Sequence, residues 1–307
     1  MDENQAGGVG TCFGYEVRSP LPFRLLRRGS GTPLVVVEGD GRQQEPSDEP
    51  FMEWTSIGGQ PFHARLYVQN GGFSLWIDPM GGYLIDTVDP SVAVPPGGDP
   101  LVREERLWGI PAGLCFLERG DLSMHASAVD VEGSALLFAA PGHFGKTTLA
   151  AAFLQGGHRV LSEDISCCTA SADPSVLPGP ALLRIRRDVY ERLEFPGTEV
   201  LLEEPHRVHL GIDEERRGDG LPVPLRGIVL LRELDEGEVK LERVDAVHAL
   251  PDLWTLSFKV RSEEARARCF QGIVALADAV PVWNLYRPMR FDNLPDVVDR
   301  VQAVCLS

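Results

Sequence analysis

Residues 134–148 read Ser-Ala-Leu-Leu-Phe-Ala-Ala-Pro-Gly-His-Phe-Gly-Lys-Thr-Thr. An apolar run of the strand type leads into a loop of small residues, and an Ala- and Leu-rich run of the helical type follows. The loop ends in Gly145-Lys146-Thr147, and a strand, a glycine-bearing loop, a lysine and a hydroxyl residue in this order form a Walker A arrangement. Its first position is Ala140, where the pattern has Gly. We therefore predict an α/β unit with a phosphate-binding loop from Ala140 to Thr148.

The chemistry expected of this loop follows from its backbone and two of its side chains. Successive N–H groups and a helix N-terminus form a cradle for anions. Lys146 would reach the outer phosphates, and the Thr147 hydroxyl would ligate Mg²⁺. An ordinary glycine turn with a surface lysine is the alternative, and the position between strand and helix disfavours it. ATP with Mg²⁺ is the expected occupant, and the predicted nucleotide-binding residues are Pro141, Gly142, His143, Phe144, Gly145, Lys146, Thr147 and Thr148.

An acidic pair follows the next predicted strand. His158-Arg-Val-Leu161 reads as a short strand, and Ser162-Glu163-Asp164 stands at its carboxyl end. Such ends face the phosphate site in α/β folds. One carboxylate there can hold Mg²⁺ while its neighbour accepts a hydroxyl proton, which is the division of work that phosphoryl transfer requires. The alternative is an acidic turn that caps a helix, and the neighbouring Walker A pattern favours the catalytic interpretation.

The predicted organisation has two parts with a boundary near Gly120. Residues 1–120 form a β-rich N-terminal domain with a possible role in substrate recognition, and residues 121–307 form an α/β P-loop domain. Strands are expected at 33–38, 62–68, 72–77, 83–88, 126–130, 134–140, 159–161, 225–231, 240–244 and 282–286. Helices are expected at 146–155, 262–279 and 295–304, and loops at 40–53 and 89–100.

Composition limits the classes of binding partner and the cellular compartment that we expect for this protein. The 29 Lys and Arg against 45 Asp and Glu give a net charge of −16, which disfavours nucleic acid and anionic membrane surfaces. No apolar run approaches the roughly 18 residues of a membrane span, and the acidic residues 1–5 lack the basic start of a signal peptide. We therefore expect a cytoplasmic protein. The cysteines show no CxxC spacing and are interpreted as reduced and structural: Cys12, Cys115, Cys167, Cys168, Cys269 and Cys305.

Two further segments allow more than one interpretation. Arg184, Arg186, Arg187 and Arg192 form a basic cluster in an acidic chain. They could steer an acidic peptide or hold a transferring phosphate, or they could form an ordinary solvated face. Arg184 and Arg186 are taken as candidate substrate residues. Residues 211–220 are polar with glycine at both ends, which suits either a mobile lid or a plain connecting loop.

The spacing of these motifs resembles the HPr kinase/phosphorylase family, and more closely the HPr kinase-related proteins of peptide natural-product gene clusters. Members read Met-His-Gly, a strand, Gly-x-Ser-Gly-x-Gly-Lys-Ser, a helix, Gly-His-Arg-Leu and Asp-Asp. This chain has Met124-His125-Ala126, the loop, Gly157-His158-Arg159-Val160 and Glu163-Asp164, with matching intervals. The resemblance implies an HPr kinase-like C-terminal domain. It also implies that Glu163 is the catalytic base, Asp164 the metal-linked acid, and His125 the histidine beside the catalytic acid. Without the resemblance, a lone histidine at the start of a strand would be interpreted as structural.

Departures from the family pattern affect the expected activity. Glu163 replaces an Asp, Thr147 replaces a Ser, and residues 141–144 replace Ser-Gly with Pro-Gly-His-Phe. The later signature Glu-Ile-Arg-Gly-Leu-Gly-Ile is reduced to residues 184–187, Arg-Ile-Arg-Arg, with Arg at the Glu position. The reverse, phosphorylase activity is therefore left open. The resemblance covers about residues 123–188, with a looser one over 222–286 and none in the first 120.

The expected function is γ-phosphoryl transfer from ATP to a hydroxyl. By the resemblance the acceptor is a serine of a peptide or protein, and a ribosomally made peptide precursor is favoured over the sugar-transport phosphocarrier. One alternative is a small-molecule kinase acting on a sugar or amino-acid hydroxyl. Another is a non-catalytic nucleotide-binding sensor or scaffold. The sequence leaves open whether pyrophosphate can serve as donor and whether a homo-oligomer forms, although family members are often hexamers.

Overall fold

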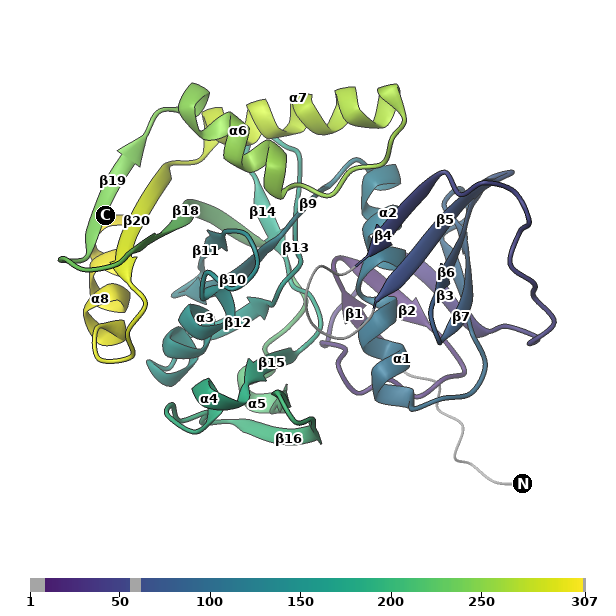
Figure 1. The fold of residues 1–307 in the computed structure, drawn as a ribbon, viewed down its shortest axis with the longest axis horizontal. Coiled ribbons are helices and arrows are strands. Elements are labelled where there is room, and N and C mark those ends of the chain that lie inside the picture. The colour runs from purple at the N-terminus through teal and green to yellow at the C-terminus, as the bar shows by residue number, and fades with distance from the viewer. Residues whose placement is uncertain (1–8, 56–61, 306–307) are drawn as a thin grey trace.

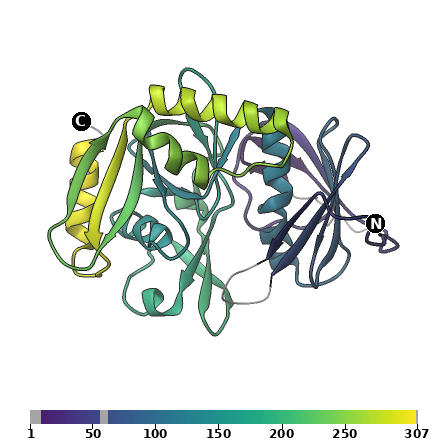
Figure 2. The ribbon, with the colours of Figure 1, turned by 45° about the horizontal axis from the view of Figure 1, so that its top comes forward.

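Three β-sheets and eight helices make up the computed structural model over residues 9–55 and 62–305, a mixed, β-rich α/β structure (Figure 1). The acidic residues 1–5, used above to argue against a signal peptide, lie outside these ranges. Figures 1 and 2 place the first sheet on one side of the molecule and the largest sheet on the other, with α1 and α2 between them. These two helices are Pro100–Leu107 and Ile110–Arg119.

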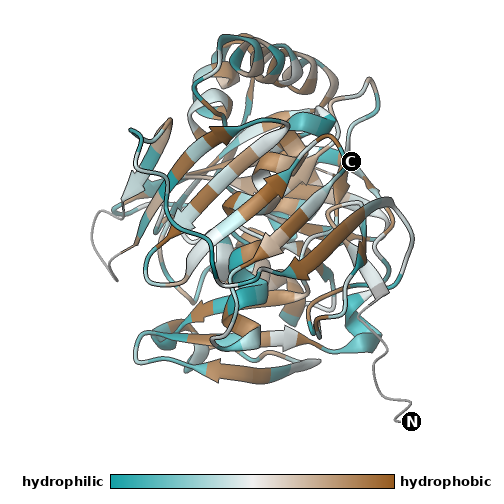
Figure 3. Cartoon of the chain, turned by 90° about the vertical axis from the view of Figure 1, so that its right-hand side faces the viewer, coloured by the Kyte–Doolittle hydropathy of each residue, from teal (hydrophilic) through white to brown (hydrophobic). Residues whose placement is uncertain are grey.

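The first sheet has eight strands in the order β1-β2-β3-β8-β7-β6-β5-β4. Most neighbours are antiparallel, and β3 is parallel to both β2 and β8. Buried and more exposed residues alternate along strands such as β3 and β8, because one face packs on α1 and α2. Figure 3 shows the hydropathy of the residues along these strands. The strands are β1 (Val9–Cys12), β2 (Tyr15–Arg18), β3 (Thr32–Glu38), β4 (Met52–Thr55), β5 (His63–Gln69), β6 (Gly72–Ile77), β7 (Gly81–Asp86) and β8 (Ser91–Val94).

Strand β8 corrects one sequence prediction, since residues 89–100 were expected to be a loop throughout. The run Ser91–Val94 pairs with β7 and β3, and the side chains of Val92 and Val94 are buried. The Val-Pro-Pro-Gly-Gly run that suggested a loop begins only at Val94, the last residue of β8. The predicted loop at 40–53 is also interrupted at its end, where β4 begins at Met52.

The second sheet is the largest and carries the Walker A sequence. Its central strand β11 is antiparallel to β10 and parallel to β18, which in turn is parallel to β20. The sheet is therefore mixed. Its strands are β9 (Leu122–Met124), β10 (Ala126–Val131), β11 (Ser134–Ala139), β12 (Arg159–Ser162), β13 (Ser166–Cys168), β14 (Ser175–Leu177), β18 (Val223–Leu234), β19 (Lys240–Val244) and β20 (Val282–Pro288).

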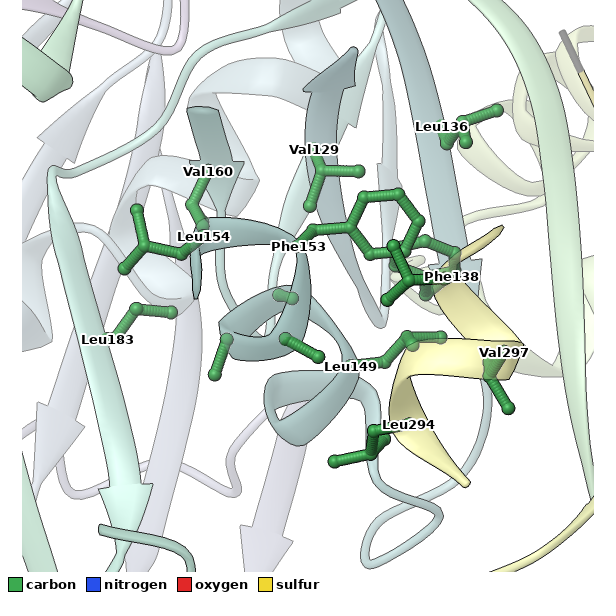
Figure 4. Packing of buried hydrophobic residues seen from close by; sticks show 14 of the residues in the cluster. Val129, Leu136, Phe138, Leu149, Phe153, Leu154, Val160, Leu183, Leu294 and Val297 are labelled. Carbon is green, nitrogen blue, oxygen red and sulfur yellow. The ribbon is translucent and has the colours of Figure 1, made fainter. Parts of the chain in front are cut away.

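Helices cover both faces of this sheet, so β11 is buried on both sides. Leu136 and Phe138 belong to the core beneath α3 (Lys146–Gln155) and α8 (Leu294–Cys305), as Figure 4 shows. Leu137 and Ala139 belong to the opposite core, beneath α6 (Ala246–Leu256) and α7 (Glu263–Ala279). This is why β11 reads as a continuous apolar run.

Helices α3 and α7 follow the sequence prediction closely. The predicted helix 146–155 has the bounds of α3, and Ser262 caps α7 by accepting a hydrogen bond from the Ala265 N–H at 3.0 Å. No helix formed by the described residues is long and apolar enough to cross a lipid bilayer. All six cysteines are buried as free thiols, in agreement with the structural role expected of them.

The third sheet lies below α3 in Figure 1 and has three strands, β15 (Leu182–Arg186), β16 (Thr198–Glu203) and β17 (Arg207–Ile212). The short helices α4 (Arg187–Tyr190) and α5 (Glu214–Arg217) flank it. Residues 211–220, expected to be a loop or lid, therefore begin within β17 and continue into α5. Ile212 is buried, and its N–H donates to the Ala181 carbonyl at 3.0 Å, which fixes this end of the segment.

The segment before β3 connects the first sheet to the second. The buried Arg27 guanidinium donates to the carbonyls of Gly179, Val160 and Leu161 at 2.8, 2.9 and 3.1 Å. On α1, the buried Glu104 carboxylate accepts the backbone N–H groups of residues 24 and 25 at 2.8 and 3.0 Å. These contacts hold the segment in place, and the division of the chain near Gly120 stays a prediction.

Glu104 leads to a pH-dependent stability prediction. Burial raises its pKa from 4.5 to about 7, so the folded state holds this proton over a pH range in which the unfolded state has lost it. The contribution of Glu104 to the free energy of unfolding is thus fully present below pH 4.5. This contribution falls by about 3 kcal/mol as the pH rises through 7. Glu104→Gln keeps one backbone acceptor and does not titrate. We expect the difference in unfolding free energy between wild type and Glu104→Gln, measured in urea at pH 5 and pH 8, to shift in favour of the variant at pH 8. An unchanged difference would contradict the assignment.

Candidate functional site

The predicted phosphate loop joins the end of β11 to the start of α3. Gly145 precedes the helix with φ of +77°, a conformation that favours glycine, and a Cβ there would lie 2.6 Å from Nη2 of Arg287, which would have to shift. Phe144 packs against the core beneath α3, whereas residues 141–143 are exposed. The first turn of α3 begins at Lys146, so its free N–H groups face the loop. The loop and helix start therefore have the form of an anion cradle.

Lys146 is buried at the centre of this arrangement. Its Nζ donates to the carbonyls of Ala140 and Pro141, both at 2.9 Å, and lies 2.9 Å from Nε2 of His125. The side chain is only 5% exposed, and this burial lowers the pKa of the ammonium. All three ammonium donors have protein partners, so an anion must compete with loop carbonyls for them.

His125 lies between β9 and β10 and joins Lys146 to the acidic pair. Its Nδ1 is 3.1 Å from the Asp164 carbonyl oxygen, and its Nε2 faces Lys146. Since an ammonium can only donate, Nε2 accepts and the proton is assigned to Nδ1. Burial also lowers the pKa of His125, which favours this neutral form. The structure thus brings His125 into contact with other predicted site residues.

The two acidic residues follow β12 and differ in burial. Glu163 is 8% exposed; its Oε1 accepts from the Thr147 hydroxyl at 2.8 Å and its Oε2 from Nε of Arg184 at 3.0 Å. Asp164 has φ of +65°, and its Oδ2 accepts from Nη2 of Arg184 at 3.1 Å. Arg184 thus bridges both carboxylates.

The pKa values of the pair are moved in opposite directions. Burial raises the pKa of Glu163 more than Arg184 lowers it. Burial acts in the same direction on Asp164, but Arg184, His125 and Lys146 together hold its pKa below the usual value. Asp164 is therefore the stronger acid of the two, and Glu163 the better proton acceptor.

Lys146, Thr147, Glu163 and Asp164 line a cavity of about 310 Å³. Arg184 and Arg186 also line it, and Arg186 is paired with Asp188 at 2.9 and 3.0 Å. Their role as substrate residues stays a prediction. Arg187 and Arg192 do not line the cavity. Sequence reasoning missed three other arginines that do: Arg207, Arg287 and Arg290.

The donors at this edge suit Mg²⁺ better than a softer metal. They are one hydroxyl and two carboxylates, all hard oxygen ligands, supplied by Thr147, Glu163 and Asp164. Among residues 9–55 and 62–305, no cluster of three or more His, Cys, Asp or Glu side chains could hold a metal by itself. Mg²⁺ commonly takes one or two carboxylates together with water and substrate phosphates, so the residues fit that ion. The carboxylate that contacts the Thr147 hydroxyl is that of Glu163 and not that of Asp164. The role of Asp164 as a metal ligand therefore stays a prediction.

No protein-family model matches the sequence, and no curated protein is similar to it. Among solved structures, the chain is similar to the Hpr(Ser) kinase/phosphatase from Coxiella burnetii. The identity is 11% and the TM-score 0.32, over 59% of this chain and 93% of that chain. A likeness of this size carries no argument for function, which depends on the site itself.

Proposed function

We propose that this protein is an ATP-dependent kinase that transfers the γ-phosphoryl group to a hydroxyl. The observation that carries the proposal is the meeting of a buried lysine at a helix start with a hydroxyl and two carboxylates around one cavity. Lys146 and Thr147 come from the loop after β11, and Glu163 and Asp164 follow the nearby strand β12. These are the groups that phosphoryl transfer needs, and they come from separate segments of the chain.

The phosphates of ATP would lie on the N–H groups of the loop and of the first turn of α3, from Gly142 to Thr148. Lys146 would exchange its loop carbonyl partners for phosphate oxygens, a charge-assisted contact that is stronger than the one it leaves. His125 would keep the ammonium directed toward the cavity through its Nε2. These residues bind and orient the donor.

Mg²⁺ would be held by Thr147 and Asp164, and it would supply neutralisation of the charge on the phosphate oxygens. The depressed pKa of Asp164 keeps its carboxylate ionised, as a cation ligand must be. Its side chain is 41% exposed, which leaves room for the water that Mg²⁺ retains.

Glu163 would accept the proton of the acceptor hydroxyl. The acceptor oxygen forms a bond to the γ-phosphorus, the bond from that phosphorus to the β–γ bridging oxygen breaks, and ADP leaves. The raised pKa of Glu163 suits a general base, since it brings the carboxylate closer to neutral pH. For this step Oε1 or Oε2 must exchange its contact with Thr147 or Arg184 for one with the acceptor.

We propose a serine hydroxyl of a peptide or protein as the acceptor, for example in a ribosomally made precursor, and a small hydroxylated metabolite as the alternative. One observation favours a different function, a nucleotide-binding sensor. Arg184 neutralises both Glu163 and Asp164, and this would suit a protein that binds ATP without transferring its phosphate.

Mass spectrometry after incubation with ATP and Mg²⁺ tests the proposal. Serine-containing peptides are compared with the same peptides carrying alanine, alongside a panel of sugars and amino acids. We expect a gain of one phosphoryl group on the serine peptides alone. A gain on a metabolite instead would show that the acceptor class is wrong. ATP binding without any product would support the sensor, and failure to bind ATP would overturn the whole proposal.

A further inference from the structure

Arg287 is a buried cation that forms no ion pair with the described residues. It is the penultimate residue of β20 and is 3% exposed, and burial lowers its pKa. Its Nη2 donates to the Phe144 carbonyl at 3.2 Å, while its Nε is buried with no hydrogen-bond partner. Within residues 9–55 and 62–305 no carboxylate lies within ion-pair distance of it, and Glu233, its cross-strand neighbour on β18, attracts it only from farther away. A buried charge without an ion pair costs free energy unless an anion binds beside it.

The position of Arg287 indicates where that anion would come from. Strand β20 is parallel to β18, and β18 is parallel to β11, so their carboxyl ends lie along the same edge of the sheet. The guanidinium lines the same cavity as Lys146 and approaches Gly145 closely, since a Cβ at Gly145 would lie 2.6 Å from its Nη2. It therefore reaches the phosphate loop from the side opposite to β12.

The other arginines around the cavity differ from Arg287 in burial or in pairing. Arg184 is bound to Glu163 and Asp164, and Arg186 is bound to Asp188. Arg207 and Arg290 are exposed, so water solvates their charges. Of the five, Arg287 alone is both buried and without an ion pair to a carboxylate in the described part of the chain.

We propose that Arg287 is a phosphate-binding residue for the nucleotide, acting together with Lys146. This inference rests on the proposed function, because it takes ATP as the occupant of the loop. The phosphate chain would supply the missing negative charge, and the planar guanidinium can donate two parallel hydrogen bonds to phosphate oxygens. Its bond to the Phe144 carbonyl fixes the guanidinium against the loop before the nucleotide arrives.

Calorimetric titration of the full chain with ATP and with inorganic tripolyphosphate tests this inference. We expect Arg287→Met to weaken both ligands by the same factor, roughly 10- to 100-fold, because one charge-assisted contact to the phosphates is lost. Arg300→Met is the matched control, since Arg300 lies on the surface of α8 and donates to the Val239 carbonyl. It should bind both ligands as wild type does.

Arg287→Gln separates phosphate binding from support of the loop. Its amide can still donate to the Phe144 carbonyl, but it carries no charge. We expect Arg287→Gln to bind ATP as weakly as Arg287→Met, with a smaller dependence on salt concentration than wild type.

Wild-type affinity in Arg287→Gln would show that the residue only supports the loop and would overturn the inference. A loss confined to ATP, with tripolyphosphate unaffected, would place Arg287 on the nucleoside and overturn it as well. A wild-type chain that binds neither ligand would instead overturn the proposed function, and this inference with it.

Discussion

Lys146→Ala is expected to remove nucleotide binding and phosphoryl transfer together. The ammonium is the buried donor at the centre of the loop, and its loss leaves the β- and γ-phosphates facing the uncompensated carbonyls of Ala140 and Pro141. Loss of a preorganised donor to developing charge costs on the order of 10³-fold in rate. ATP affinity should fall by at least about 10-fold. Calorimetric titration with ATP and the rate of product formation measure the two effects.

Lys240→Ala is the matched control for this substitution. Lys240 lies at the start of β19 with its side chain exposed, where it pairs with Glu242. The control should bind ATP and turn over as wild type does. Transfer at a wild-type rate by Lys146→Ala would exclude the loop as the donor site.

Glu163→Gln is expected to spare ATP binding and to abolish transfer. The glutamine is nearly isosteric, its carbonyl can accept from Arg184 and its amide can donate to Thr147, so the buried site should remain folded. It cannot accept a proton, and loss of a general base costs roughly 10²- to 10⁴-fold in rate. Single-turnover rates and ATP titrations of the same preparations separate transfer from binding.

Glu163 contacts Thr147, a predicted ligand of Mg²⁺. The dependence of the transfer rate on Mg²⁺ concentration therefore distinguishes a general base from a metal ligand at position 163. If Glu163 were a metal ligand rather than the base, excess Mg²⁺ would restore part of the activity of Glu163→Gln. We expect no such recovery in this variant, and a partial one in Asp164→Asn. The opposite pattern would exchange the two roles. In the wild type, transfer should rise with pH through the elevated pKa of Glu163, because only the ionised carboxylate accepts a proton.

Sequence reasoning identified those parts of the site that local sequence patterns determine. The loop before Lys146 and the acidic pair after β12 each follow one short strand, and their meeting follows from the general rule for carboxyl ends of strands. His125 was placed only by its spacing from the loop, and its contact with Lys146 could not be derived from composition or periodicity.

Arg287 shows what the sequence could not supply. The strand that carries it was predicted at residues 282–286, yet the position of this strand beside β18 depends on pairing between segments about 50 residues apart. Its bond to Phe144 spans 143 positions. Without the strand order, Arg287 is one arginine among many. The strands β13 and β14 were missed for a related reason, since each has three residues, too few for a period to be visible.

The attachment of Arg27 to β12 has a thermodynamic consequence for the whole chain. Two of the carbonyls that it holds belong to Val160 and Leu161, three and two residues before Glu163. A ligand that displaced the segment around Arg27 would therefore act on the strand that carries the acidic pair. By reciprocity, nucleotide binding at the pair would change the affinity of that ligand by the same factor. The first and second sheets would then be coupled through Arg27 together with the other contacts of its segment.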